Sequence, residues 1–332
     1  MVYIFFPFLR STNIYICSVF VHRYRDLDPN IRAECVRAMG LWFKKYPGHF
    51  LDGAYLRYVG WVLSDAQTQV RLEAVRALAL AYEQTAYIGA AALQHFTERF
   101  KPRLVEMAVG DIELSVRVAV VQVLQTIDGH GLLEDDQRQR LCLLVFDEEA
   151  RVRRAVSGFV KGVWEETVEE RLVGRKSSDT DKHRAGIKAL GMLLVSWGRA
   201  LNKTTGDADA DEEESMDLGE GSSKRVRAKE VASLVGHNPK GRTALIVEAL
   251  WDEVEPVRDW ETLLDVLLLD HSPAGEGSRP TSRSKGKQAG TEESVDEAYR
   301  LEEVEEAVLL ELFVASLRKA LADAANAKKV LV

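Results

Sequence analysis

The sequence lacks the residue patterns that metal centres and disulfide frameworks require. Its 332 residues include only three cysteines, Cys17, Cys35 and Cys142, which are far apart and form no CxxC or cysteine–histidine cluster. An odd number of scattered cysteines predicts neither a disulfide scaffold nor a zinc site. Such cysteine usage is typical of a protein in a reducing compartment.

Motifs of common catalytic and nucleotide-binding sites are also absent. The chain contains no GxxxxGK[ST] loop, no GxGxxG turn before a helix, no HExxH and no GxSxG. Its seven histidines are isolated from one another. No set of residues suggests acid–base or nucleophilic catalysis, so we expect a protein that is not an enzyme and that needs no cofactor.

No apolar run in the sequence is long enough to span a bilayer. The most apolar stretch, MVYIFFPFLRSTNIYICSVF at the start, is interrupted by Pro7, Arg10 and other polar residues. It also lacks the basic leader of a secretory signal. Residues 1–18 are interpreted as the remnant of a buried helix at a truncated or misannotated start, in preference to the alternative of a membrane anchor, and no membrane partner is expected.

The net charge of −8 is distributed unevenly along the chain. Residues 204–221 hold eight acidic and no basic side chains, and so equal the whole net charge. Residues 1–203 hold 28 Lys and Arg against 24 Asp and Glu, and residues 222–332 hold 16 against 20. The first part is therefore mildly basic, which allows an anionic partner without requiring one.

What the sequence does contain is a repeated figure: an aspartate, four variable residues, a valine or isoleucine, and an arginine. Successive arginines of this figure are 39, 46 and 36 residues apart. After each figure, mostly aliphatic residues recur at spacings that place them on the same helical face as its valine or isoleucine. Its members are Asp26 and Arg32, Asp65 and Arg71, Asp111 and Arg117, and Asp147 and Arg153. A period near forty with two amphipathic segments predicts an all-α, HEAT- or armadillo-like solenoid of antiparallel helix pairs.

The aspartate of each figure falls in the turn before the second helix, or at the start of that helix. There its carboxylate can accept amide hydrogen bonds and oppose the positive end of the helix. We expect the arginine to reach the aspartate of its own or a neighbouring repeat, so that the pairs form a ladder along the stack. The figure is therefore interpreted as structural and not catalytic.

Composition divides the chain into successive segments. Two stretches have too few apolar residues to pack and are predicted to be disordered loops. The predicted order is residues 19–110 and 111–203 as repeats, 204–222 as an acidic loop, 223–270 as helical repeats, 271–291 as a basic flexible loop, and 292–332 as a C-terminal helix.

Three strings in the first third of the chain resemble the stromalin conservative domain of the stromal-antigen HEAT-repeat family, the cohesin accessory subunits. They are VFVHRYRD at 19–26, YLRYVGWVLSDAQTQVRLEAVRAL at 55–78, and HFTERFKPRLVEMAVGD at 95–111. A weaker similarity continues through residues 244–270 and the last helix. Members of the family are several times longer, so the chain resembles a fragment.

The resemblance implies a non-enzymatic scaffold in the nucleus, associated with chromatin. Family members bind the kleisin subunit of the cohesin ring, and through it the ring ATPase subunits. They also contact double-stranded DNA and dock regulatory proteins in sister chromatid cohesion.

In the family, an aromatic and basic pocket that the kleisin completes receives short aromatic peptide motifs. The matching residues here are Tyr24, Arg25, Trp61 and Arg99. Separations of 37 and 38 residues between Tyr24, Trp61 and Arg99 predict that they stand on first helices of consecutive hairpins. An exposed Tyr, Trp and two Arg have the composition of a binding hot spot. The alternative is that Trp61 is a core residue between Leu56 and Leu63.

Two other functions remain open from the sequence. One is a DNA-binding module that acts through a basic face, with Lys44, Lys45, Arg71, Arg76, Lys101 and Arg103 as candidate contacts. The other is an unrelated HEAT-repeat scaffold, such as a transport receptor or a phosphatase scaffold. The strings YVGW and FTERFK argue against this last possibility.

Overall fold

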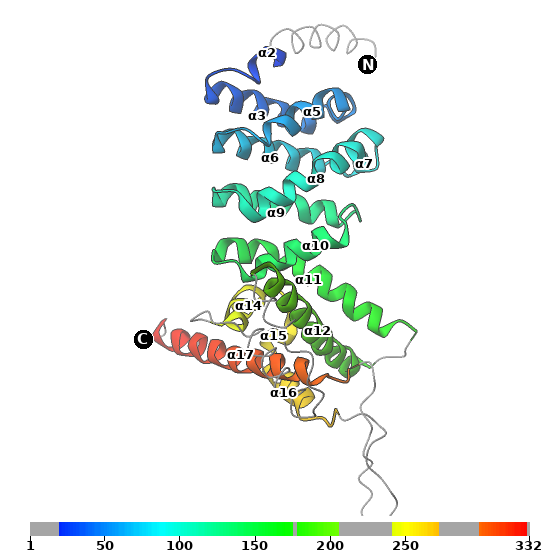
Figure 1. Cartoon of the computed structure of the whole chain (residues 1–332), viewed down its shortest axis with the longest axis vertical. Coiled ribbons are helices and arrows are strands. Elements are labelled where there is room, and N and C mark those ends of the chain that lie inside the picture. Colours follow the sequence, from blue (N-terminus) through cyan, green and yellow to red (C-terminus); the bar gives the residue numbers. More distant parts are fainter. Residues whose placement is uncertain (1–19, 175–177, 206–240, 272–298, 331–332) are drawn as a thin grey trace, which may run out of the picture. The chain divides into compact units, whose positions relative to one another are not determined.

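The structure, a computed structural model, describes residues 20–174, 178–205, 241–271 and 299–330 (Figure 1). Every regular element within these ranges is a helix, and no strand occurs among them. The prediction of an all-α protein is confirmed. The predicted remnant at 1–18 and the two predicted disordered loops lie outside the described residues, apart from Thr204 and Thr205 at the end of a helix and His271.

The chain divides into two compact units, residues 1–156 and 157–332. The first unit contains pairs of helices separated by short turns, with two extra single-turn helices. In chain order these are α2 (Val21–Arg23), α3 (Pro29–Lys45), α4 (Pro47–Phe50), α5 (Gly53–Val62), α6 (Thr68–Tyr82), α7 (Thr85–Ile88), α8 (Ala91–Gly110), α9 (Leu114–Asp128), α10 (Asp135–Cys142), the 3-10 turn η2 (Leu143–Phe146) and the start of α11 (Ala150–Leu172).

The helices of the first unit stack in two rows. The first helices of successive pairs contact one another, α5 with α8 and α8 with α10, and the second helices do the same, α3 with α6 and α6 with α9. Figure 1 shows these layers following one another in the order of the sequence. The aliphatic positions of the repeated figure, among them Val36, Leu78 and Val120, are buried between the layers. The predicted solenoid of helix pairs is therefore confirmed.

The second helices approach closely at one small residue. A Cβ atom added at Gly40 of α3 would lie 2.8 Å from the Cα atom of Ala77 in α6. Atoms essentially never pack at that separation, so any larger residue would push the two helices apart. Glycine at this position lets the backbones of α3 and α6 come together.

The predicted ladder is present, and each rung joins one repeat to the next. Arg32 donates from Nε and Nη2 to the two carboxylate oxygens of Asp65 at 2.8 and 2.9 Å. Arg71 donates in the same way to Asp111, with both distances at 2.8 Å. Arg117 pairs with the carboxylate of Asp147. Fork-shaped pairs of this kind fix geometry as well as charge.

Three of the four arginines also tie down the turn of their own repeat, whereas Arg117 donates to the backbone carbonyl of Ala108. The Nη1 atom of Arg71 donates to the backbone carbonyl of Asp65 at 2.9 Å, and the Asp65 carboxylate accepts the amide of Gln67 at 2.9 Å. Of the two positions expected for the aspartate, the structure selects the turn, because the N-cap of α6 is Gln67 and not Asp65. Arg153 makes the equivalent bond to the carbonyl of Asp147 at 2.8 Å. The aspartate therefore orders the turn ahead of the helix.

The ladder predicts a dependence of stability on pH. Burial alone would raise the pKa of Asp65 and Asp111, but hydrogen bonds from Arg32, Arg71 and backbone amides hold both pKa values below the usual range. A carboxyl group with a lowered folded-state pKa stabilises the protein above its unfolded-state pKa, and that stability is lost as pH falls through the folded value. At pH values under about 4, we therefore expect the free energy of unfolding to decrease.

Urea titrations at a series of pH values measure this effect. A variant with Asp65→Asn and Asp111→Asn should be less stable at neutral pH and should lose less stability on acidification. An acid dependence as steep as that of the unchanged protein would contradict the assignment to these two carboxylates.

The second unit packs its helices around α17. Its elements are the remainder of α11, α12 (Asp179–Thr205), α14 (Arg242–Leu250), α15 (Glu255–Arg258), α16 (Trp260–Leu267) and α17 (Glu303–Val330). Helix α17 contacts α12, α14, α15 and α16. A buried ion pair between Lys188 and Glu305, with side chains 8% and 6% exposed, joins α12 to α17. The C-terminal helix predicted over 292–332 is observed over Glu303–Val330.

Candidate functional site

A cluster of aromatic rings lies between the end of α2 and the neighbouring helix α5. The Tyr24 ring stacks on Trp61 with centroids 6.2 Å apart, and Tyr58 meets both rings edge-on at 4.9 and 5.6 Å. Phe20 lies 5.5 Å from Tyr58. Tyr24 is 5% exposed, so the expectation that it is an exposed contact is wrong: the surrounding rings enclose it. Its ring packs against the indole of Trp61.

Trp61 is the accessible member of the cluster, with 41% of its surface exposed. The neighbours that defined the alternative interpretation, Leu56 and Leu63, are both fully buried. These leucines therefore form the core of this hairpin, and Trp61 lies at its boundary with solvent. An exposed indole supported by two tyrosines offers a rigid apolar surface to a ligand.

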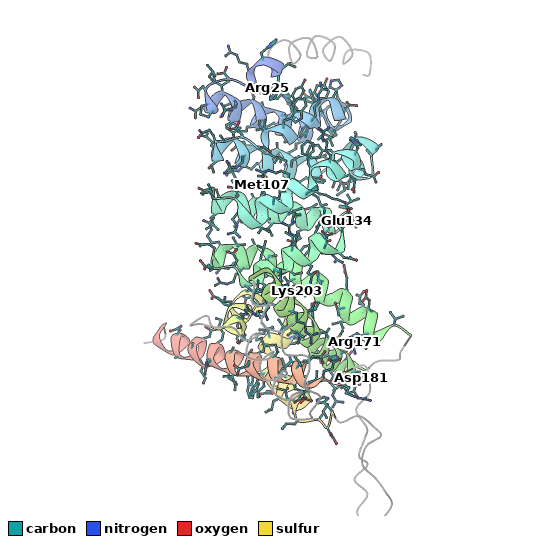
Figure 2. All side chains as sticks on the ribbon, viewed as in Figure 1. Arg25, Met107, Glu134, Arg171, Asp181 and Lys203 are labelled. Carbon is teal, nitrogen blue, oxygen red and sulfur yellow. The ribbon has the colours of Figure 1, made fainter. Side chains whose placement is uncertain are left out.

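Two arginines lie over the rings. The guanidinium carbon of Arg25 is 5.0 Å from the Tyr24 centroid and 5.6 Å from the Trp61 centroid, and its position is labelled in Figure 2. That of Arg57 is 5.1 Å from Tyr58 and 5.7 Å from Trp61. Sequence reasoning missed Arg57, although it precedes Trp61 by one helical turn and so shares its face. Both arginines are exposed.

Arg99 lies on the next hairpin and is connected to the cluster through Phe100 and Gly60. It lies on α8, exposed, with its guanidinium carbon 5.5 Å from the ring of Phe100. The Phe100 ring fills the space beside Gly60, where an added Cβ would lie 2.3 Å from its Cζ atom. Because Gly60 directly precedes Trp61, this contact sets α8 alongside the aromatic cluster. As predicted, Tyr24, Trp61 and Arg99 come from the first helices of consecutive hairpins, with Tyr24 at the end of α2.

We call Tyr24, Arg25, Arg57, Tyr58, Trp61 and Arg99 the aromatic–arginine cluster. Among the residues that the structure describes, its three arginines form no ion pair with a carboxylate. Two such guanidinium groups over an exposed indole, with a third on the next hairpin, favour a ligand that is both aromatic and anionic.

The lysines and arginines proposed to touch DNA are placed differently. Arg71 and Lys101 are buried, at 8% and 4% exposure, because Arg71 is a rung of the ladder and Lys101 pairs with Glu98 and Glu134. Neither is available to a phosphate. Three others carry acidic partners: exposed Lys44 with Glu83, exposed Arg76 with Glu73, and half-buried Arg103 with Glu106. Lys45 lies 5.6 Å from the ring of Tyr46.

Gly60 provides a test of how the cluster is held. Replacing it with alanine places a methyl group where the Phe100 ring now lies, so the ring or α8 must move. We expect Gly60→Ala to lower the free energy of unfolding by about 1–3 kcal/mol, measured by urea denaturation. Gly53→Ala is the matched control, because a Cβ there meets nothing within 4 Å. Equal stability of the two variants would show that the packing of the Phe100 ring does not require glycine at position 60.

These observations define the class of the protein. Across the described ranges, no group of three or more His, Cys, Asp and Glu residues could hold a metal ion. None of the helices in that part of the chain is both long and apolar enough to cross a membrane. The stacked hairpins and the rungs between them are those of a HEAT- or armadillo-like helical-repeat protein.

Comparison with known proteins shows what the chain is similar to. Residues 25–101 match the family model of the stromalin conservative domain. The chain is 41% identical over 160 residues to "Cohesin subunit psc3" of Schizosaccharomyces pombe, across 48% of this chain and 16% of that protein. It is 27% identical over 256 residues to "Sister-chromatid cohesion protein 3" of Arabidopsis thaliana, across 77% of this chain and 20% of that protein. The first third of the chain thus matches the stromalin conservative domain, and the chain is similar to proteins named as a cohesin subunit and a sister-chromatid cohesion protein.

A solved structure shows the same fold. The cohesin subunit Scc3 from Z. rouxii superimposes with a TM-score of 0.56 and 23% identity, over 78% of this chain and 27% of that one. The chain spans about a fifth or less of the length of the two relatives described above. The aromatic–arginine cluster lies within the matched domain, apart from Tyr24, which directly precedes it.

Proposed function

We propose that this chain is a non-enzymatic scaffold of a cohesin-type complex, and that the aromatic–arginine cluster binds a short peptide with an aromatic side chain and acidic flanks. The observation that carries the proposal is the exposed indole of Trp61 with the guanidinium groups of Arg25 and Arg57 over it, neither of them paired with an acidic side chain among the described residues. Such a surface is electrostatically unsatisfied until an anion arrives.

The chemistry of the cluster divides between its parts. Trp61 offers a flat apolar wall on which the aromatic side chain of a peptide can stack. Arg25, Arg57 and Arg99 offer guanidinium forks that can bind carboxylates with two parallel hydrogen bonds. Because Arg25 and Arg57 already lie over the rings, less side-chain freedom is lost when the peptide binds.

The proposed partners are those that the family resemblance implies. They are the kleisin subunit, which would complete the peptide site, the ring ATPase subunits reached through the kleisin, and regulatory proteins with short aromatic motifs. The relatives are named as cohesin subunits and as a sister-chromatid cohesion protein, which supports a role in the nucleus on chromatin. Double-stranded DNA is a further proposed ligand.

Affinity purification from nuclear extract tests the scaffold role. We expect the tagged chain to retain the kleisin and the ring ATPase subunits, and an aromatic peptide with acidic flanks to bind that complex saturably. The proposal would be ruled out if the chain retained none of these subunits and its complex bound no peptide, while circular dichroism showed that the chain is folded.

Duplex DNA binding is tested in parallel by titration at several salt concentrations. Because five of the six candidate basic side chains have acidic partners, we expect few phosphate contacts and a shallow dependence of affinity on salt. A steep dependence with no peptide binding would favour the DNA-binding module instead.

A further inference from the structure

Helix α8 has a proline in its interior. Pro102 lies in the middle of the helix Ala91–Gly110, and its side chain is exposed. Proline has no amide hydrogen, and its ring crowds the carbonyl group four residues earlier, so it destabilises a helix at such a position. An exposed side chain contributes little burial of apolar surface to offset this effect. What Pro102 does provide is a backbone carbonyl group that no amide of its own occupies.

That group is the carbonyl of Glu98. In an uninterrupted helix, its oxygen would accept a hydrogen bond from the amide of residue 102, which proline does not have. Residue 98 is exposed, and its side chain pairs with Lys101 at 2.8 Å. Carbonyl groups in the middle of a helix are normally occupied by the following turn. Helix α8 therefore presents a backbone acceptor on its surface, where a regular helix presents none.

Contacts between α5 and α8 give the position of this acceptor. A Cβ atom added at Gly60 would lie 2.3 Å from the Cζ atom of Phe100, and Arg103 donates from Nη2 to the carbonyl of Leu63 at 3.4 Å. Both contacts join residues that are 40 positions apart, so the two helices run parallel in one register. The turn of α8 that lies level with Trp61 is therefore the one that contains the proline.

The acceptor and Trp61 open onto the same surface. Arg99 and Pro102 are three residues apart and exposed, so both lie on the outer face of α8, as Trp61 does on α5. The Glu98 carbonyl points along the helix axis toward Pro102. Packed helices have axes roughly 8–10 Å apart, and an extended peptide advances about 3.3 Å per residue. A peptide that stacks on Trp61 therefore reaches the Glu98 oxygen within about three residues.

We propose that the Glu98 carbonyl accepts a hydrogen bond from a backbone amide of the peptide that stacks on Trp61. This role rests on the proposed peptide-binding function, to which it adds a fixed register. The aromatic side chain on the indole gives one anchor, and the backbone amide on α8 gives a second. With two anchors the peptide crosses the cluster in one direction, and the residue that supplies the amide is not a proline.

The charge of the surface selects a neutral donor for this position. Arg25, Arg57 and Arg99 are exposed and make the surface basic, so a lysine or arginine of the peptide would be repelled. A backbone amide donates a hydrogen bond without carrying a charge. The acidic side chains of the peptide bind the guanidinium groups instead. The cluster then satisfies both the acceptors and one backbone donor of its ligand.

Titration of a fluorescent peptide into the complex of this chain with kleisin tests the proposal. The peptide has a central phenylalanine with aspartates on both sides. In each analogue one backbone amide is replaced by an ester, which removes one donor with little change in shape. With the unchanged chain, the ester at one position within about three residues of the phenylalanine should weaken binding roughly fivefold, as expected for one lost hydrogen bond.

The variant Pro102→Ala closes the acceptor, because the alanine amide bonds to the Glu98 carbonyl. It should bind the parent peptide roughly fivefold more weakly, and the sensitive ester should bind it no worse than the parent peptide does. Its urea midpoint should rise, since alanine favours a helix interior over proline, so the lost affinity is not lost folding. Pro47→Ala is the matched control. Pro47 is the first residue of α4, where no carbonyl awaits its amide, and peptide binding should not change.

Three results would overturn the inference while leaving the peptide site in place. They are an equal effect of every ester on the unchanged chain, the same sensitive position in Pro102→Ala, and full affinity of Pro102→Ala for the parent peptide. Failure of the parent peptide to bind the unchanged chain would instead overturn the proposed function, and the role of the Glu98 carbonyl with it.

Discussion

Replacing Trp61 with alanine should abolish binding of an aromatic, acidic peptide to a complex of this chain with kleisin, while the fold survives. Trp61 is 41% exposed, so its loss leaves no cavity in the core. Truncating an aromatic anchor of this kind commonly costs more than about 2 kcal/mol of binding energy, a loss of roughly thirtyfold or more in affinity. Fluorescence titration with a labelled peptide measures it, and circular dichroism checks the fold.

Arg99→Glu should have an equally large effect for a different reason. Charge reversal sets a carboxylate against the acidic flank of the peptide, so it removes an attraction and adds a repulsion. Arg140→Glu, at an exposed position on α10, is the matched control and should bind normally. Duplex DNA binding should persist in Trp61→Ala, because an indole carries no charge for phosphate. If Trp61→Ala unfolds the protein, Trp61 is a core residue; if it binds peptide normally, the site lies elsewhere.

Tyr24 should respond differently from Trp61. Because its ring is enclosed by Phe20, Tyr58 and Trp61, Tyr24→Ala removes buried contacts and should lower stability first and peptide affinity only as a consequence.

Asp111→Ala should cost the protein about 3–5 kcal/mol of unfolding free energy, because it leaves the guanidinium group of Arg71 buried without its partner. The Arg71 and Asp111 side chains are 10% and 3% exposed, which makes this a deeply buried rung. A loss of this size is a large fraction of the total stability of a typical domain. The midpoint of urea denaturation, followed by circular dichroism, measures it.

Glu83→Ala is the control for this rung. Glu83 also pairs with a basic residue of another repeat, Lys44, but both side chains are more than half exposed. Its removal should cost no more than about 1 kcal/mol. Similar losses in the two variants would show that burial does not set the strength of the rungs.

The fold and the ladder could be predicted from the sequence because both depend on spacing. A helix repeats its faces every three or four residues, so Val36, Leu78 and Val120 could be assigned to a core without knowing their partners. The figure of aspartate and arginine recurs in register with that pattern. Which repeat each arginine would reach was left open, since it depends on the rise between hairpins, and the structure resolves it in favour of the next one.

The exposure of single side chains could not be predicted in the same way. In the sequence, Lys101 cannot be distinguished from a surface lysine. In the structure it is buried and pairs with Glu134, which is 33 residues later in the chain. Tyr24 is buried because Phe20 and Tyr58 enclose its ring. Neither the spacing of these residues in the sequence nor their residue types predicts this burial. Arg57 could not be assigned from the sequence because its place in the cluster depends on Trp61, one helical turn away. Only the structure shows that the Trp61 ring faces solvent.

The ladder gives the two edges of the first unit different mechanical properties. Along the edge that carries the aspartates, paired hydrogen bonds hold each turn to the next at fixed length. Away from that edge, side-chain packing and pairs with an exposed partner, such as Lys44–Glu83 and Lys101–Glu134, hold the hairpins together, so a bending force should separate the hairpins there first. Tyr24 and Trp61 precede ladder aspartates by two and four residues, and the Arg32–Asp65 rung joins their turns. We therefore expect bending of the stack to change the spacing of the Tyr24 and Trp61 rings least, because both lie beside the edge that the ladder holds.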